Sequence, residues 1–271
     1  MPAISFSLTF LDIDPALVSA WSRLLSEQFP RSRLREELYP VVLESSLKNY
    51  KESFDCIVSP GNSFARMDGG FDLLISRFFS EQRAKMAGVE EKEVLRDMLK
   101  YVQDGHFRRW KGLQPVGSCY LIDMLPWMTE TSSSAESEAE ETEVVAWNRF
   151  RCRYVAHSPT MRVPSALWRE EIVYDCMWSM LNEVYNHNEA IAADEQQEKN
   201  IKCGFKQQRI RKVVVSGLGT GTGGLDREVC AQLMVSAYVA FVSAVENGDA
   251  NEWRWSTAQA WDKKISATAK K

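Results

Sequence analysis

The feature that most constrains this sequence is a glycine-rich loop that joins an apolar run to a helical pattern. The apolar run, residues 54–58, stops at Pro60-Gly61, which turns the backbone out of a strand. Gly69 and Gly70 then precede a helical pattern over residues 71–79. A strand, a glycine loop and a helix in this order direct backbone N–H groups and a helix N-terminus toward an anion. A simple turn before an ordinary helix start explains the same residues equally well, so this loop alone does not assign a site.

A second loop of the same kind follows a predicted strand at residues 213–216. Residues 217–224 read GLGTGTGG and lead into a helical pattern over residues 226–245. The G-x-G-x-x-G spacing is present, but no second strand with an acidic residue follows the helix, so a Rossmann unit is excluded. A Walker A loop is excluded because no Lys-Ser or Lys-Thr pair ends the glycines. Two glycine loops after two strands instead suggest a diphosphate held between them.

Three polar residues near these loops are candidates for ligand contacts. Residues 4–11 alternate apolar and polar side chains, which predicts a strand, and Asp12 lies at its carboxyl end, where α/β sheets meet ligands. Asn62 offers an amide that can both donate and accept. Asp72 offers a carboxylate at a helix start, where we expect the helix dipole to lower its pKa and weaken it as a base.

The rest of the chain alternates predicted strands and helices, which indicates an α/β fold with a mixed sheet between helix layers. Asp14-Pro15 predicts a helix start, with Asp14 as the N-cap. The other predicted strands cover residues 40–43, 116–125 and 149–157, and the other predicted helices cover residues 91–101 and a long stretch from residue 166.

We expect residues 1–271 to form one domain, because no Pro/Gly linker separates two complete cores. Residues 129–146 are rich in Ser, Thr and Glu and predict a disordered acidic insertion. Residues 187–210 predict a charged surface excursion. The tail from about residue 247 carries Trp253, Trp255 and Trp261, which we expect to pack against the body.

The composition favours a globular protein of the cytosol or nucleus. A net charge of −4 gives no general attraction to nucleic acid, no apolar run approaches the roughly 20 residues that span a bilayer, and no signal peptide is expected. The six scattered cysteines predict free, buried thiols. No metal or cofactor is expected, because His106, His157 and His187 lie at no ligand spacing from a cysteine.

Together, the two loops resemble those of the macrodomain, or ADP-ribose-binding, superfamily. Its first loop reads N-A-A-N and then G-G-G-V-D-G, and its second reads S-T-G-I-Y-G. The corresponding residues here are SPGN at 59–62, DGGFDL at 68–73 and GTGTGG at 219–224. The chain is most similar to the macro-like branch of fungal, phage and bacterial proteins, with which it shares residues 12–15, 59–62, 67–70, 159–164 and 217–224.

The resemblance implies a three-layer α/β/α sandwich with ADP-ribose, or a derivative of it, across the carboxyl ends of the strands. Asp12 and Ile13 would meet the adenine, and Asn62 and Asp72 would be catalytic at the distal ribose, with Asp72 as general base. The implied ligand-binding residues are Asp12, Ile13, Ser59, Pro60, Gly61, Asn62, Gly69, Gly70, Gly219, Thr220, Gly221, Thr222 and Gly223.

The macro-like branch implies a hydrolase that removes phosphate from ADP-ribose 1''-phosphate or cleaves a related ADP-ribosyl ester. The alternative is a non-catalytic module that binds ADP-ribose or another nucleotide. Three departures favour the alternative: Ser59 replaces the first asparagine of N-A-A-N, Leu73 and Ser76 replace the glycine and histidine after the family aspartate, and Thr222-Gly223 replaces Ile-Tyr, which removes an aromatic side chain from the distal ribose. An interaction scaffold with a vestigial pocket is a third reading.

Overall fold

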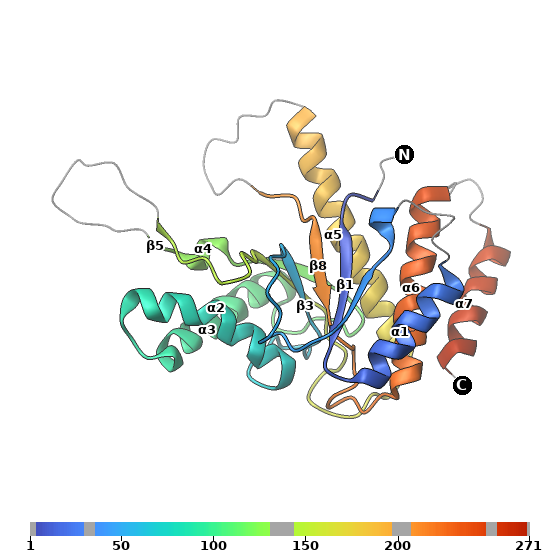
Figure 1. Cartoon of the computed structure of the whole chain (residues 1–271), viewed down its shortest axis with the longest axis horizontal. Helices are drawn as coiled ribbons and strands as arrows, with labels where there is room; N and C mark the ends of the chain where they lie inside the picture. Colours follow the sequence, from blue (N-terminus) through green and yellow to red (C-terminus); the bar gives the residue numbers. More distant parts are fainter. Residues whose placement is uncertain (1–3, 30–35, 131–143, 197–206, 248–253, 270–271) are drawn as a thin grey trace.

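The computed structural model describes residues 4–29, 36–130, 144–196, 207–247 and 254–269. Six of its strands form one sheet in the order β2-β1-β8-β3-β7-β4 (Figure 1). All neighbouring strands are parallel except β4, which runs antiparallel to β7 at one edge. The strands are β1 Ser7–Asp12, β2 Val41–Glu44, β3 Cys56–Ser59, β4 Tyr120–Asp123, β7 Tyr154–His157 and β8 Lys212–Val215. This arrangement brings the ends of β1, β8, β3 and β7 to the same edge of the sheet.

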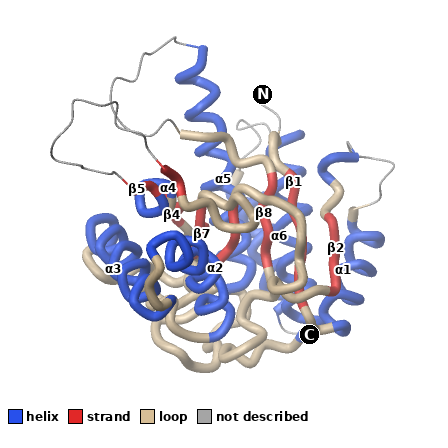
Figure 2. Tube along the Cα trace, turned by 60° about the vertical axis from the view of Figure 1, so that its left-hand side comes forward, coloured by secondary structure: helices blue, strands red, loops and turns tan. Residues whose placement is uncertain are grey.

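Helices cover both faces of the sheet and confirm the predicted three-layer α/β/α sandwich (Figures 1 and 2). One layer holds α1 Pro15–Gln28, α5 Ile172–Gln196, α6 Arg227–Asn247 and α7 Trp255–Ala269. The other holds α2 Gly70–Ala87, α3 Glu91–Trp110 and α4 Leu125–Met128. A short 3-10 helix, η2 Glu36–Leu38, packs against the first layer through Leu38.

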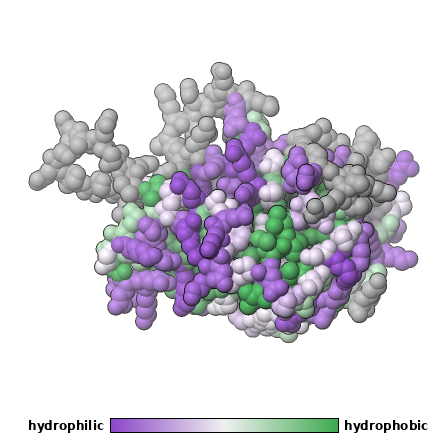
Figure 3. Space-filling view, viewed as in Figure 1, coloured by the Kyte–Doolittle hydropathy of each residue, from purple (hydrophilic) through white to green (hydrophobic). Residues whose placement is uncertain are grey.

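The alternation of strand side chains produces these two cores. In β8, Val213 and Val215 pack against the α1, α5 and α6 layer, whereas Val214 packs against the α2 and α3 layer. All three side chains are fully buried, as in strands covered by helices on both faces. In the view of Figure 3, apolar residues come to the surface near the centre, between the α2–α3 layer and α1.

The predicted start of the first helix is confirmed. Asp14 caps α1, because its side chain accepts a hydrogen bond from Ala16 N at 3.0 Å, and Pro15 occupies the first helical position. Leu17, Trp21 and Leu24 form the buried stripe of this helix. The cap therefore fixes the chain direction immediately after Asp12, at the edge of the sheet where β1 ends.

The structure corrects the boundaries of the long central helix. The helix α5 begins at Ile172 rather than near residue 166, because the backbone N–H of Leu167 is bonded to Gly223 O in the second glycine loop. It also extends to Gln196, well into the predicted surface excursion at residues 187–210. Asn188 explains the extension: its side chain is buried and exchanges two hydrogen bonds with the backbone of Ile210, at 2.7 and 2.8 Å. The remainder of that segment, residues 197–206, lies outside the described residues.

The predicted acidic insertion and the tail each contain residues that the structure describes and residues that it does not. Residues 131–143 lie outside the described residues, so their predicted disorder stays a prediction; their flanks, β5 Thr129–Glu130 and β6 Val144–Val145, form an antiparallel pair. In the tail, Trp261 packs edge-on against Trp178 and donates a hydrogen bond to Tyr174. Trp255 is 77% exposed, so the expectation that it packs against the body was wrong, and Trp253 is not among the described residues.

The helix α6 is long and apolar enough over Arg227–Glu246 to cross a membrane by length and composition. It packs against α1 and α5, with Cys230, Leu233 and Met234 fully buried. A central position in a helix layer accounts for this composition. The absence of a membrane partner stays a prediction.

Candidate functional site

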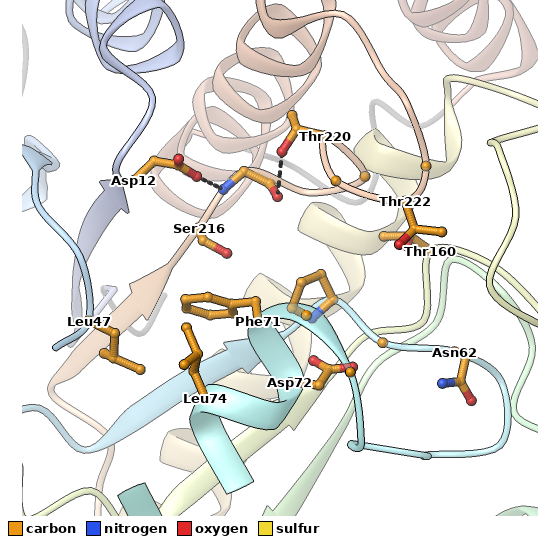
Figure 4. Close-up of a pocket in the computed structure, with 18 of the residues that line it drawn as sticks. Asp12, Leu47, Asn62, Phe71, Asp72, Leu74, Thr160, Ser216, Thr220 and Thr222 are labelled. Carbon is orange, nitrogen blue, oxygen red and sulfur yellow. Dashed lines mark hydrogen bonds between the residues drawn. The ribbon is translucent and has the colours of Figure 1, made fainter. Parts of the chain in front are cut away.

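A cleft of about 560 Å³ lies at the edge of the sheet where β1, β3, β7 and β8 end (Figure 4). It brings together segments that are far apart in the sequence: residues 11–13, 45–47, 60–62, 66–74, 160–164 and 216–223 contribute to its lining. Asp12 and Leu47 lie toward one end and Asn62 toward the other, with Phe71 and Asp72 between them. The cleft is therefore elongated along the sheet edge, as a dinucleotide-sized ligand requires.

Twelve of the thirteen predicted ligand-binding residues line this cleft, as does Asp72. The exception is Ser59, which is fully buried behind the wall and contacts Asp72 and His157 instead. Ser59 was assigned to the ligand because it stands where the first asparagine of N-A-A-N usually is. As the last residue of β3 it lies in a strand whose four residues are all buried, and it contacts Asp72 and His157 inside the protein.

At one end of the cleft, Asp12 links the first strand to the second glycine loop. Its Oδ1 accepts a hydrogen bond from Asp14 N and its Oδ2 accepts one from Gly217 N, both at 3.0 Å. Each carboxylate oxygen has a further lone pair, so Asp12 can still accept from a ligand. Ile13 beside it is 69% exposed.

Apolar side chains face Asp12 across this end of the cleft. Leu47, Phe71 and Leu74 come from the loop after β2 and from the first turns of α2 (Figure 4). Leu74 is 47% exposed although it is large and apolar. Apolar side chains opposite a hydrogen-bond acceptor suit a purine base with an amino group.

The second glycine loop lines the cleft and has unpaired backbone donors. Within the described part of the chain, the N–H groups of residues 219–223 donate no hydrogen bond. The loop closes on itself through Gly224 N to Gly221 O and Leu225 N to Gly219 O, each at 3.0 Å. Successive backbone N–H groups without a protein partner are the kind of donor that can cradle a phosphate.

Two positions in this loop show why glycine is needed there. Gly219 has a φ of +74°, in the left-handed region that other residues rarely adopt. A Cβ on Gly223 would lie 2.4 Å from the carbonyl oxygen of Gly219. Gly221 differs, because a Cβ there would meet no atom within 4 Å. The glycines thus shape the loop at 219 and 223 and leave space for a ligand at 221.

The two helices that follow the glycine loops differ at their starts. The side chain of Asp226 accepts from the N–H groups of Glu228 and Val229, so α6 is already capped. The N-cap of α2 is Gly69, which has no side chain, and the N–H groups of residues 70–72 donate no hydrogen bond among the described residues. The start of α2, unlike that of α6, is therefore open to an anion.

The side chain of Asn62 supports the first loop. Its Oδ1 accepts from Phe64 N at 3.1 Å, and its Nδ2 donates to Arg66 O at 3.0 Å. These bonds hold a tight turn in which Ala65 has a φ of +51°. One Nδ2 hydrogen remains for a ligand, and the catalytic role of Asn62 stays a prediction.

The environment of Asp72 corrects the expectation for its pKa. Its side chain is almost fully buried in the first turn of α2, and burial raises its pKa to about 7, with the nearby charge of Asp68 acting in the same direction. A hydrogen bond from Ser59 lowers it by less. Desolvation therefore outweighs the helix dipole from which a low pKa was expected.

Sequence reasoning missed His157, the residue behind Asp72. His157 ends β7 opposite Ser59 in β3, and its ring lies 3.2 Å from Ser59 Oγ through Nδ1. Burial lowers its pKa to about 4. A Cβ on Gly61 would come within 2.6 Å of the His157 ring and 2.8 Å of Asp72 Oδ2, so only glycine lets the loop approach both. A histidine at the end of an apolar strand was the one signal in the sequence.

Thr160 was also missed. Its side chain is fully buried, lines the cleft, and its hydroxyl has no hydrogen-bond partner in the described structure. Buried hydroxyls are nearly always paired, so an unpaired one at a cleft marks a contact for a ligand or water. No group of three or more His, Cys, Asp or Glu residues in the described ranges could hold a metal ion.

The fold and cleft define a three-layer α/β/α protein with a cleft lined by two glycine loops at the carboxyl ends of its parallel strands. No family model and no curated protein matches the sequence. Among solved structures, the chain is similar to the macrodomain of Mycobacterium tuberculosis DarG, with 15% identity over 72% of this chain and 86% of that one and a TM-score of 0.36. Because both the identity and the TM-score are low, the function is argued below from the cleft itself.

Proposed function

We propose that this protein binds ADP-ribose, or a derivative of it, and hydrolyses a bond at the distal ribose. The observation that carries the proposal is the row of free N–H groups at residues 219–223, opposite the open start of α2. Two sets of free amides suit the two phosphates of a nucleoside diphosphate. The motifs shared with the macro-like branch of the macrodomain superfamily favour ADP-ribose over other diphosphates.

The two ends of the cleft suit the two ends of this ligand. Asp12 can accept from an adenine amino group while Phe71 and Leu47 contact the base. At the other end, Asp72, Thr160 and the remaining Nδ2 hydrogen of Asn62 can reach ribose hydroxyls or the group attached to C1''.

Asp72 is the candidate for acid–base chemistry at C1''. A carboxyl group with a pKa of about 7 can act in either direction near neutral pH. For ADP-ribose 1''-phosphate, water attacks phosphorus and the bond from phosphorus to the ribosyl oxygen breaks. Asp72 gives its proton to that oxygen, and the attacking water gives one proton to the resulting Asp72 carboxylate, which yields inorganic phosphate and restores the acid. An ADP-ribosyl ester would be cleaved with the same proton donor.

A binding module without turnover is the second candidate. It is favoured by Thr222-Gly223, which places no aromatic side chain over the distal end of the cleft, and by Asn62, whose side chain already supports its own loop. In this reading the same cleft recognises ADP-ribose and releases it unchanged.

Calorimetric titration with ADP-ribose, ADP and AMP tests the binding step. We expect ADP-ribose and ADP to bind and AMP to bind more weakly, because AMP lacks the second phosphate. Gly221→Glu should abolish binding, since the new side chain would enter the cleft without a clash and its carboxylate would repel the diphosphate. Gly105→Glu on α3 makes the same change at a position where a Cβ meets only Arg108, at 3.9 Å, and should bind like the wild type. Equal affinities for all three ligands, or equal behaviour of the two variants, would contradict the proposed diphosphate site.

Release of inorganic phosphate from ADP-ribose 1''-phosphate then separates the two candidates. An enzyme should turn over, with Asp72→Asn at least about 100-fold slower, the usual range for loss of a general acid. Asn62→Ala should lose turnover with modest loss of affinity if that residue is catalytic. Tight binding of ADP-ribose without turnover of its phosphate or ester derivatives would establish the binding module.

A further inference from the structure

Behind the floor of the cleft, three side chains from three elements form a continuous hydrogen-bonded chain. Ser59 Oγ lies 2.8 Å from Asp72 Oδ1 and 3.2 Å from His157 Nδ1. The other ring nitrogen of His157, Nε2, lies 3.1 Å from the carbonyl oxygen of Asn62. Ser59 and His157 are fully buried and Asp72 is 6% exposed, so protein atoms make nearly all of the contacts.

The carbonyl oxygen of Asn62 can only accept a hydrogen bond, and the directions of the other hydrogen bonds are worked out from it. The carbonyl oxygen of Asn62 has no hydrogen, so Nε2 of His157 must donate to it. In a neutral imidazole the hydrogen on Nε2 leaves Nδ1 with a lone pair, and the single hydrogen of the Ser59 hydroxyl can go either to Nδ1 or to Asp72 Oδ1. Donation to Asp72 leaves Nδ1 facing the Ser59 oxygen with no hydrogen between them, so donation to Nδ1 is the arrangement that pairs every buried polar atom of the chain. Ser59 then has no hydrogen left for Asp72. A separation of 2.8 Å between two oxygens requires one, so it must belong to Asp72.

The other consistent arrangement places an ion pair inside the protein. In it His157 is an imidazolium that donates to Ser59, and Ser59 donates to an Asp72 carboxylate. Its ring would be charged next to the rings of His106 and Tyr120, whose centroids are 6.1 and 6.0 Å away. Charging two groups this deeply is unfavourable, because burial opposes the charged form of both.

The charged residues near the cleft do not reverse this preference. Asp68 is the acidic neighbour whose charge acts on Asp72, and it disfavours a second carboxylate. Arg66, the nearest cation to Asp68, is bound to it at 2.6 Å, and both side chains are largely exposed. His106 faces His157 and further opposes a charge on that ring.

We propose that Ser59 and His157 are positioning residues that hold Asp72 as a neutral carboxylic acid at the floor of the cleft. A neutral acid does not repel an anionic group bound beside it, and its proton, held on Oδ1 against Ser59, has to leave that hydrogen bond before a departing oxygen can take it. Asp72 is then a proton donor in the resting site, where the resemblance alone implied a general base. The protonation state of Asp72 in the ligand-free protein does not depend on the identity of the ligand. The role of Asp72 in releasing phosphate rests on the proposed function.

The protonation state can be measured directly by NMR on the ligand-free protein labelled with ¹³C at aspartate Cγ. We expect the Asp72 signal, identified by its loss in Asp72→Asn, to titrate at about pH 7 or above, at least about three units above an unperturbed aspartate, because the pKa of about 7 includes a hydrogen bond donated by Ser59 that this arrangement lacks. In His157→Phe the hydroxyl of Ser59 is free to donate to the carboxylate, which should move that midpoint down by about one unit or more. His106→Phe is the matched control: it removes a second buried histidine, which is bonded to Tyr120 rather than to Ser59, and should leave the midpoint in place.

A second measurement needs no variant that could fail to fold. The chain has three histidines, so ¹⁵N-histidine spectra resolve each ring, and we expect His157 as the neutral Nε2–H tautomer at pH 7. An imidazolium at His157, an Asp72 midpoint near ~4, or equal midpoints in His157→Phe and His106→Phe would each overturn the proposal. If Asp72 titrates near 7 while ADP-ribose does not bind, the proposed function fails and the assignment of the proton stands.

Discussion

Replacing Asp72 with asparagine should change how the stability of the protein depends on pH. Asparagine has nearly the same shape as a protonated aspartate, and it can donate to Ser59 but cannot ionise. In the wild type, the folded protein keeps Asp72 protonated up to about pH 7, whereas the unfolded chain ionises it from about pH 4 upward. The variant should therefore gain stability relative to the wild type as the pH rises.

The size and sign of this effect follow from the pKa of Asp72. Burial raises it from 3.8 to about 7 in the folded protein. A group whose pKa is raised by folding stabilises the folded state fully below its unfolded pKa, and this contribution is lost as the pH rises through the folded pKa. Three pH units at 1.36 kcal/mol each give a loss on the order of 4 kcal/mol between about pH 4 and pH 7. The wild type alone will not show this loss clearly. The pKa of His157 is lowered from 6.5 to about 4 by folding, so His157 makes the protein more stable as the pH rises between these two values.

Urea unfolding of both proteins at intervals from pH 4 to pH 8.5 measures the difference. The free energy of unfolding of Asp72→Asn minus that of the wild type should increase with pH up to about 7 and then level off. Subtraction removes the contribution of His157 and of other groups common to both proteins. A difference that stays constant over this range would refute a raised pKa at Asp72.

Three further predictions test other parts of the structure. Gly223→Ala should weaken binding of ADP-ribose by calorimetry, because its Cβ would lie 2.4 Å from a backbone oxygen, whereas Gly221→Ala adds a methyl group in open space and should change affinity much less. Asn188→Ala should lower the free energy of unfolding in urea by about 3 kcal/mol, since it leaves the buried N–H and C=O groups of Ile210 unpaired; a loss under about 1 kcal/mol would contradict this reading. Replacing residues 131–143 with Asn-Gly should leave the melting temperature nearly unchanged, because Glu130 and Val144 are paired and a two-residue turn can join them.

The fold was predictable where local patterns and tertiary structure agree. The strict alternation over residues 4–11 and the Asp14-Pro15 cap gave β1 and α1 correctly. The limits of α5 were not predictable, because each depends on a distant backbone group. Gly223 O holds Leu167 outside the helix, and the backbone of Ile210 explains a buried Asn188 within a polar stretch.

The lining of the cleft was predictable to a similar degree, and its chemistry was not. Residues in the two glycine loops line one cleft, since parallel strands end at the same edge of the sheet. The pKa of Asp72 depends on desolvation by surrounding residues, a quantity that its position in the sequence does not contain. His157 lies 85 positions beyond Asp72 in the sequence and meets it through Ser59 only because β3 and β7 pair in register.

The pairing of β1 with β8 has a consequence for synthesis on the ribosome. The N-terminal strand finds its partner in the sheet, and Asp12 its hydrogen bond to Gly217, only after 205 further residues have been added. At roughly 5–20 residues per second, translation of that interval takes on the order of 10–40 seconds. During this time β1 can pair with β2, but the inner edge of β1 stays unpaired, with Leu8 and Phe10 exposed in place of their final burial. The nascent N-terminal segment should therefore be a substrate for chaperones that bind extended apolar chains, and release should coincide with the emergence of β8 and α6.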